Sequence, residues 1–227
     1  DIFVRTYDKK KEFTKSFAFR MKTDSEKKLT RNTGFYERTS KLTRNFVDAR
    51  GFWLPNDYTK HGVINEYTAC REKAVVIDLS SLRKFEILGP DAEELMNYTL
   101  TRNIKKLSVG QIVYSAMCYE NGTMFDDGTL LRLSETGFRW VCGDEYAGEW
   151  LKEQAKKKNL KVIIKNSTDQ INNVSLQGPN SRKILEKIIF TPPTQPTISE
   201  LQWFRFTICR LEELNGIPLI VSRTGYT

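Results

Sequence analysis

The sequence predicts an α+β fold with mostly antiparallel sheets and flanking helices. Apolar runs of strand length are followed by single amphipathic helices, and tight turns join neighbouring strands directly. Asn121-Gly122 and Asn215-Gly216 each lie between alternating apolar segments, which is typical of β-hairpins. A doubly wound parallel sheet would need repeated crossovers from strand to helix to parallel strand. The hairpins therefore favour α+β over α/β.

Two strand and helix units share one pattern, after a first predicted helix over residues 62–74. In each unit a short apolar strand ends at a Gly-Pro pair and an amphipathic helix follows, over residues 85–96 and again over residues 174–189. Proline is tolerated in the first helical turn because its missing N–H has no partner there. The other predicted elements are a strand over 75–77, a hairpin over 113–133, a strand over 138–142, a helix that ends at Lys156–Lys158, and a hairpin over 204–221.

The composition is that of a globular protein without a membrane span. The 227 residues are 39% hydrophobic and have a mean hydropathy of −0.49. No apolar run approaches the roughly 18 residues that a transmembrane helix needs. We expect a soluble, cytoplasmic protein with no membrane partner. The four cysteines form no CxxC pair and His61 is the only histidine, so no metal site is expected.

The positive charge is concentrated near the amino terminus. Residues 1–50 hold 14 of the 36 Lys and Arg residues and 7 of the 28 Asp and Glu residues, so +7 of the net +8 lies there. Nucleic-acid-binding folds usually spread basic residues over a surface. We therefore expect no nucleic-acid partner. We interpret residues 1–50 as a basic arm; runs of charge of this kind are more often solvated surface segments than segments that attract an anion.

The turn at Asn121-Gly122 sets the register of the central hairpin. A two-residue loop of type I′, which needs positive φ at both positions, makes paired residue numbers add up to 243. Thr123 then lies opposite Glu120, and Asp127 lies opposite Ala116. The register therefore decides which way each side chain points.

The two adjacent carboxylates of this hairpin point to opposite faces. Asp127 shares its face with Tyr114, Thr129 and Leu131, whereas Asp126 lies with Met117 and Leu130. They cannot chelate one ligand together. A carboxylate in mid-strand is costly to bury unless it is hydrogen-bonded. Two interpretations stay open here: a functional carboxylate, or one that caps a loop or pairs with a nearby cation.

Common catalytic motifs are absent from the sequence. It contains no P-loop, no GxSxG, no glycine-rich dinucleotide motif and no HExxH, and its single histidine excludes an ordinary hydrolase triad. The hairpin carboxylates alone do not identify an enzyme.

Five blocks in order resemble the folate-dependent aminomethyltransferase family, whose best-known member is the glycine cleavage T-protein. Related enzymes include dimethylglycine and sarcosine oxidising enzymes and folate-dependent demethylases. The blocks are Trp53–Pro55 with Tyr58 and Glu66–Arg71; Asp78–Leu82 with Gly89–Ala92; Gly110–Ser115 through Glu120–Gly122 to Asp126-Asp127; Leu176–Pro179; and Ser222–Thr227.

The resemblance implies a T-protein-like folate-binding fold that contains a ferredoxin-like unit. The arm at 1–50 would come first in the chain. Residues 51–82 and 166–227 would form a first, truncated folate-binding subdomain. Residues 83–165 would form a ferredoxin-like subdomain inserted into it. The pterin-binding glutamate and a barrel-like domain of the family would lie beyond Thr227.

The resemblance also implies a function and a set of site residues. The protein would move a methylene or methyl group from a small methylated or aminomethyl donor to tetrahydrofolate; a non-catalytic folate-binding protein is the alternative. Asp127 corresponds to the catalytic carboxylate. The positions that match folate-contacting residues are Tyr114, Tyr226, Leu82 and Leu131.

Two positions depart from the T-protein pattern. T-proteins usually have histidines where this sequence has Tyr67 and Ser81. A small-molecule one-carbon donor is therefore the expected partner, and a lipoyl carrier protein stays an open one.

Overall fold

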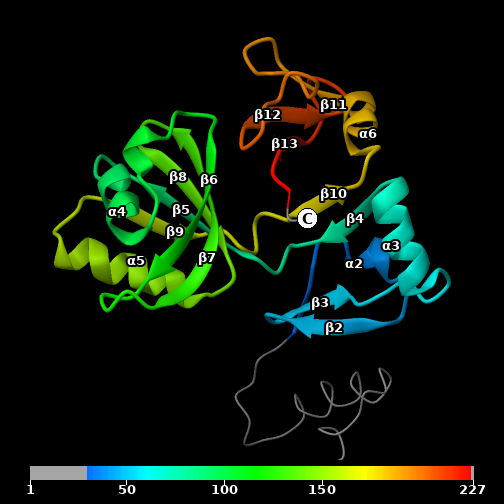
Figure 1. Ribbon diagram of the computed structural model, residues 1–227, viewed down its shortest axis with the longest axis horizontal. Helices are drawn as coiled ribbons and strands as arrows, with labels where there is room; N and C mark the ends of the chain where they lie inside the picture. The colour runs from blue at the N-terminus through cyan, green and yellow to red at the C-terminus, as the bar shows by residue number, and fades with distance from the viewer. Residues whose placement is uncertain (1–29, 226–227) are drawn as a thin grey trace, which may run out of the picture. The chain divides into compact units, whose positions relative to one another are not determined.

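The computed structural model describes residues 30–225 (Figure 1). Contacts along the chain divide it into two compact units. Of the described residues, the first unit contains 30–81 together with Asn172–Asn180. The second contains Leu82–Ile171 and the chain from Ser181 onward. Within residues 30–225, no helix combines the length and apolarity that crossing a membrane requires.

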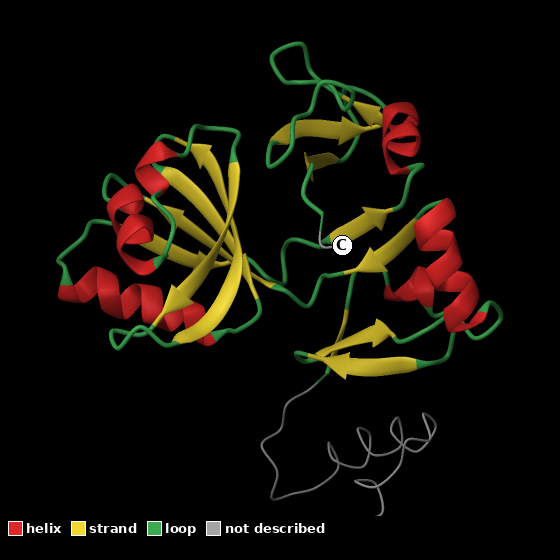
Figure 2. Ribbon diagram, in the orientation of Figure 1, coloured by secondary structure: helices red, strands yellow, loops and turns green. Residues whose placement is uncertain are grey.

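From residue 30 onward, the first unit contains two small sheets and two helices (Figure 2). One sheet has the strand order β1-β3-β2, and β4 pairs antiparallel with β10 in the other. The predicted helix over residues 62–74 is confirmed as α3. The bounds are β1 (Arg31–Asn32), α2 (Tyr36–Thr39), β2 (Phe46–Ala49), β3 (Phe52–Pro55), α3 (Gly62–Glu72), β4 (Val75–Asp78) and β10 (Val174–Gln177).

The predicted basic arm is wrong for the part of it that the structure describes. Strand β2 pairs antiparallel with β3, and β1 pairs with β3 in parallel. Phe46 of this segment is buried, as are Phe52 and Trp53 on the strand with which it pairs, and a count of charges does not detect this packing. Residues 1–29 of the arm lie outside the described residues.

The second unit is built on a five-stranded antiparallel sheet with the order β6-β7-β8-β5-β9. Without β6, the remaining order and the two crossover helices are those of a ferredoxin-like unit, as predicted. The bounds are β5 (Arg83–Leu88), α4 (Ala92–Thr99), the 3₁₀ helix η1 (Ile104–Lys106), β6 (Ile112–Cys118), β7 (Met124–Ser134), β8 (Gly137–Cys142), α5 (Tyr146–Lys157) and β9 (Ile163–Asn166).

Helices α4 and α5 cover one face of this sheet (Figure 1). Their apolar side chains, such as Met96 and Leu151, pack against strand residues such as Leu130 and Trp140, all fully buried. At Gly148 an added Cβ would lie 2.3 Å from the Phe85 ring, so a glycine lets α5 approach the sheet. This face is the main core of the unit.

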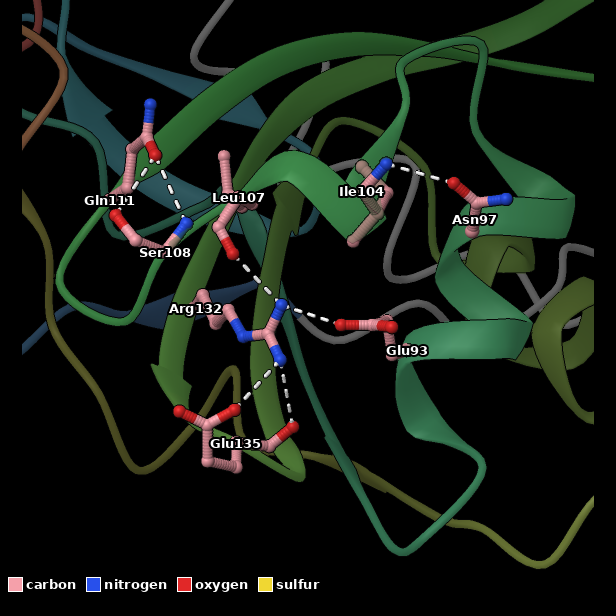
Figure 3. Close-up of polar contacts among 8 residues, drawn as sticks. All are labelled: Glu93, Asn97, Ile104, Leu107, Ser108, Gln111, Arg132 and Glu135. Carbon is pink, nitrogen blue, oxygen red and sulfur yellow. Dashed lines mark hydrogen bonds and ion pairs between the residues drawn. The ribbon is translucent and has the colours of Figure 1, made fainter.

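A buried arginine fastens the segment between α4 and β6 (Figure 3). Arg132 pairs with Glu93 of α4 at 2.6 Å and with Glu135 at 3.2 Å, and it donates to the Leu107 carbonyl at 2.8 Å. The Asn97 side chain accepts from the Ile104 amide at 2.9 Å. These contacts fix the chain as it enters β6.

Part of the chain after Ser181, around Phe204, Phe206 and Ile220, packs on the opposite sheet face. Phe206 forms a second small core with Ile112 and Leu131, and the Ile112 amide donates to the Phe204 carbonyl at 2.8 Å. The compact units therefore differ from the predicted grouping of residues 166–227 with 51–82, because these apolar contacts join the later strands to the five-stranded sheet. The elements are α6 (Ser181–Ile188), β11 (Ile189–Phe190), β12 (Phe206–Leu211) and β13 (Pro218–Ser222).

Candidate functional site

The hairpin of β6 and β7 closes through a longer loop than predicted. The Tyr119 amide donates to the Thr123 carbonyl at 2.8 Å, and the Gly122 amide donates to the Tyr119 carbonyl at 2.9 Å. Of Asn121 and Gly122, only Gly122 has a positive φ, +84°. This is the three-residue pattern of a turn followed by a left-handed glycine. The predicted type I′ turn and the pairing of Thr123 with Glu120 are therefore wrong.

A β-bulge restores the predicted register beyond the loop. Cys118 pairs with Met124 but Met117 pairs with Asp126, so Phe125 is an extra residue on β7. From Met117 and Asp126 onward along the hairpin, paired numbers add up to 243, as the prediction required. One additional loop residue and one bulge residue compensate each other, which is why the faces were predicted correctly.

Asp127 and Tyr114 meet on the face opposite the helices. Tyr114 pairs with Thr129 and Asp127 pairs with Ala116, so the two side chains are diagonal neighbours on one face. The Tyr114 hydroxyl donates a hydrogen bond to Asp127 Oδ2. The carboxylate is half-buried, and the tyrosine is 52% exposed. The predicted pair is thus brought together at a surface that a ligand can reach.

The other predicted site residues are placed less closely. Leu131 is buried on the same face, but it lies four residues from Asp127, about 13 Å along the strand. Leu82 is half-buried and directly precedes β5. Arg83 and Gly128 both pair with Cys142 of β8, so they lie at the same level of the sheet. The residues that precede them, Leu82 and Asp127, therefore lie at the same end of the sheet. Tyr226 lies outside the described residues. The structure therefore groups Tyr114 with Asp127 and leaves Leu131 as a core residue further along the strand.

Asp126 has a structural environment of its own. It is only 9% exposed, and it accepts hydrogen bonds from the backbone amides of Asp127 at 2.9 Å, Gly143 at 3.3 Å and Asp144 at 3.0 Å. Burial, and then the nearby Asp126 charge, raise the pKa of the Cys142 thiol. Cys142 therefore stays protonated, and it is unsuited to act as a thiolate nucleophile.

Charged residues on the site face were missed by sequence reasoning. Lys84 lies in one row with Val141, Thr129 and Tyr114, is 1% exposed, and donates from Nζ to the Leu82 carbonyl at 2.8 Å. In the next row, Arg139 and Glu86 form an ion pair at 2.6 Å. The alternation of charged and apolar residues in β5 was the available signal, but only the strand order shows that these charges share a face with Asp127.

Comparisons with known proteins agree with this architecture. The family model of the GCVT N-terminal domain matches residues 35–227. The solved glycine cleavage system aminomethyltransferase T of Bartonella henselae superposes with a TM-score of 0.70 at 25% identity, over 87% of this chain and 51% of that one.

Two curated relatives extend the comparison. The trimethylamine-oxide aldolase of Ruegeria pomeroyi is 52% identical over 227 residues, which are 100% of this chain and 29% of that protein. An aminomethyltransferase of Symbiobacterium thermophilum is 34% identical over 204 residues, 87% of this chain and 52% of that protein. The chain thus spans less than a third of the first relative and about half of the second. The resemblance inferred from the five sequence blocks is confirmed: the chain belongs to the aminomethyltransferase (GCVT) family, whose T-protein fold its second unit and its small sheets share.

Proposed function

We propose that the protein transfers a one-carbon unit, as methylene or methyl, from a small methylated or aminomethyl donor to tetrahydrofolate. The observation that supports this proposal is the hydrogen bond from Tyr114 to Asp127, at a solvent-accessible end of the sheet face that lies opposite α4 and α5. The family membership supports it, since several relatives are named aminomethyltransferases. Action in the cytoplasm is part of the same proposal.

The residues present fit a reduced pterin. Asp127 offers a negative acceptor, and among the described residues no hydrogen bond occupies its Oδ1, while Tyr114 donates to Oδ2. An exposed aromatic ring beside a carboxylate suits a flat ligand that carries N–H groups and gains positive charge. Leu82, half-buried at the same end of the sheet, adds an apolar contact.

The chemistry assigned to the chain's own residues is electrostatic and proton-accepting. Tetrahydrofolate, when bound, supplies the ring nitrogen that takes up the one-carbon unit. The Asp127 carboxylate stabilises the positive charge that develops there and accepts the proton that is lost. The Tyr114 hydroxyl holds that carboxylate in one orientation. Fixed groups of this kind contribute about a hundredfold to a thousandfold in rate.

The donor class is inferred from two observations. Tyr67 and Ser81 stand where T-proteins usually have histidines. The Ruegeria pomeroyi relative is named for trimethylamine oxide, a methylated amine derivative. Both favour a methylated small molecule over an aminomethyl group bound to a lipoyl carrier protein.

The test separates binding from turnover. Tetrahydrofolate affinity and the turnover of methylated amines, their oxides and sulfonium compounds are measured for the complete protein and for Asp127→Asn. We expect turnover to fall at least a hundredfold while the folate Kd changes by less than about threefold, because the lost charge acts mainly on the transition state. Glu120→Gln, on the same hairpin, serves as the matched control. Wild-type turnover in Asp127→Asn would refute the proposal, and folate binding without any turnover would favour the non-catalytic alternative.

A further inference from the structure

Asp126 and Asp127 are neighbours in sequence but differ in what they contact. Asp127 points to the face of Tyr114, whereas the Asp126 carboxylate is buried under three backbone amides. Two of these amides belong to Gly143 and Asp144, which join β8 to α5. The third is the amide of Asp127 itself. The Asp126 carboxylate therefore connects the backbone of Asp127 to the residues that precede α5.

Hydrogen bonds between the strands do not hold the backbone amide of Asp127. Strand β8 ends at Cys142, which pairs with Gly128, so the β8 ladder stops one residue short of Asp127. On the other side, the carbonyl of Ala116, the partner of Asp127, accepts from Thr101 at 3.1 Å and is thus turned toward the outer edge. The Asp127 amide instead donates to Asp126 Oδ1 at 2.9 Å.

The β-bulge makes this attachment necessary. The extra residue Phe125 precedes Asp126 directly, and bulges bend a strand and re-aim its side chains. Without a fixed anchor, the strand could rotate at this point, and Asp127 would leave the Tyr114 hydroxyl. Asp126 supplies the anchor at the first residue after the bulge.

We propose that Asp126 is a positioning residue that holds the Asp127 carboxylate against Tyr114. The inference rests on the proposed function for its catalytic consequence, but its structural content can be measured without any turnover. An Asn at this position has a single acceptor oxygen. Its NH₂ group would face an amide donor from either Gly143 or Asp144, so Asp126→Asn breaks part of the anchor at nearly constant volume.

The first experiment uses the unaltered complete protein. Hydrogen exchange is measured by mass spectrometry on peptides that cover residues 124–128 and 142–145. We expect slow exchange of the Asp127, Gly143 and Asp144 amides. Rapid exchange of the Asp127 amide would overturn the proposal, whatever the variants do.

The second experiment compares Asp126→Asn with a matched control. In protein labelled with fluorotyrosine, the Tyr114 signal is assigned by its loss in Tyr114→Phe. We expect Asp126→Asn to move this signal toward its position in Asp127→Asn. We also expect a kcat about a hundredfold lower with KM within about threefold, as misplacement of a reacting group by about 1 Å predicts. The control Asp144→Ala removes the side-chain hydrogen bond that the Tyr146 amide donates in the same turn but none to β7, and it should leave the signal in place.

The outcomes distinguish the two proposals. An unchanged Tyr114 signal in folded Asp126→Asn shows that Asp126 only supports the turn before α5, and it overturns the positioning role. A shifted signal in a protein that transfers no one-carbon unit keeps the positioning role and rejects the proposed function. If Asp126→Asn does not fold, the exchange measurement on the unaltered protein decides.

Discussion

The two faces of the five-stranded sheet are built by the same strands but carry different chemistry. The face under α4 and α5 is a continuous apolar core that includes Leu130 and Trp140. The opposite face carries Tyr114, Asp127 and the partly buried ion pair of Glu86 with Arg139. Since side chains alternate along a strand, the helix-covered face holds the main core, and the other face can hold polar groups beside the smaller core around Phe206. Substitutions on the two faces should therefore change different properties.

The largest expected effect on activity comes from the site face. Asp127→Asn should reduce turnover a hundredfold to a thousandfold, because the proposed function assigns to Asp127 the negative charge that stabilises a developing cation. Its thermal midpoint should change little, since Asp127 is half-buried and its main partner is an exposed tyrosine. Kinetics and thermal unfolding of the same preparation check both statements. A large loss of stability would show that the two faces are not separable.

The largest expected effect on stability comes from the helix-covered face. Leu130→Ala removes a fully buried side chain of the main core and should cost about 3 kcal/mol of unfolding free energy. Denaturant unfolding measures this loss, and kcat below the unfolding transition should stay near the wild-type value. The neighbouring Thr129→Ala, on the other face, is the control and should cost well under half as much. Equal costs for the two would contradict the comparison.

A smaller effect is expected at Tyr114. Tyr114→Phe keeps the ring but removes the hydroxyl that donates to Asp127. We expect kcat to fall about tenfold, in line with the loss of one hydrogen bond to a charged group. Combining it with Asp127→Asn in a double-mutant cycle should show strong non-additivity, because each variant removes the same charge-assisted hydrogen bond. Additive effects would mean that the tyrosine acts independently of the carboxylate.

The smallest effect is expected at the exposed hairpin tip. Lys157 pairs with Glu120 at 2.7 Å, which lowers the Glu120 pKa and raises the Lys157 pKa. Because the pKa of the Glu120 carboxyl is lowered, the stability that the ion pair contributes is lost as the pH falls through that pKa. The raised ammonium pKa means that it is also lost as the pH rises above about 10. Glu120→Gln should therefore lower the thermal midpoint slightly at pH 7 and by less at pH 3. A larger effect at pH 3 than at pH 7 would contradict the pairing.

The central hairpin shows how far a sequence pattern reaches. Alternation predicted that Tyr114, Asp127 and Leu131 share one face, and the structure confirms it. The predicted turn was wrong, because Gly122 alone adopts positive φ and the loop gains a residue. The faces survived since the bulge at Phe125 restores the period of two. The choice between loop types is worth little energy, whereas burial of a whole face is worth much more.

The basic segment shows the opposite case. Its charge suggested an arm, yet residues 31–49 form β1, α2 and β2, and the buried rings of Phe46 and Phe52 contribute to the first unit. Charge composition is a sum over residues and carries no information on which side chains face inward. Pairing of β1 with β3 in parallel joins segments about 20 residues apart, which no local pattern encodes.

The sequence by itself determined the α+β class and the face to which Asp127 points, and its five motif blocks carried the family resemblance, which implied a ferredoxin-like unit. These follow from local periodicity and from short motifs. Only the tertiary structure decided which groups bind the side chain of Asp126, the residue before Asp127. Asp126 is held by amides 17 and 18 residues away, and Lys84 reaches the site face from a strand two places across the sheet. Such contacts depend on strand order and chain reversal, which the residues specify only through the packing of the whole unit.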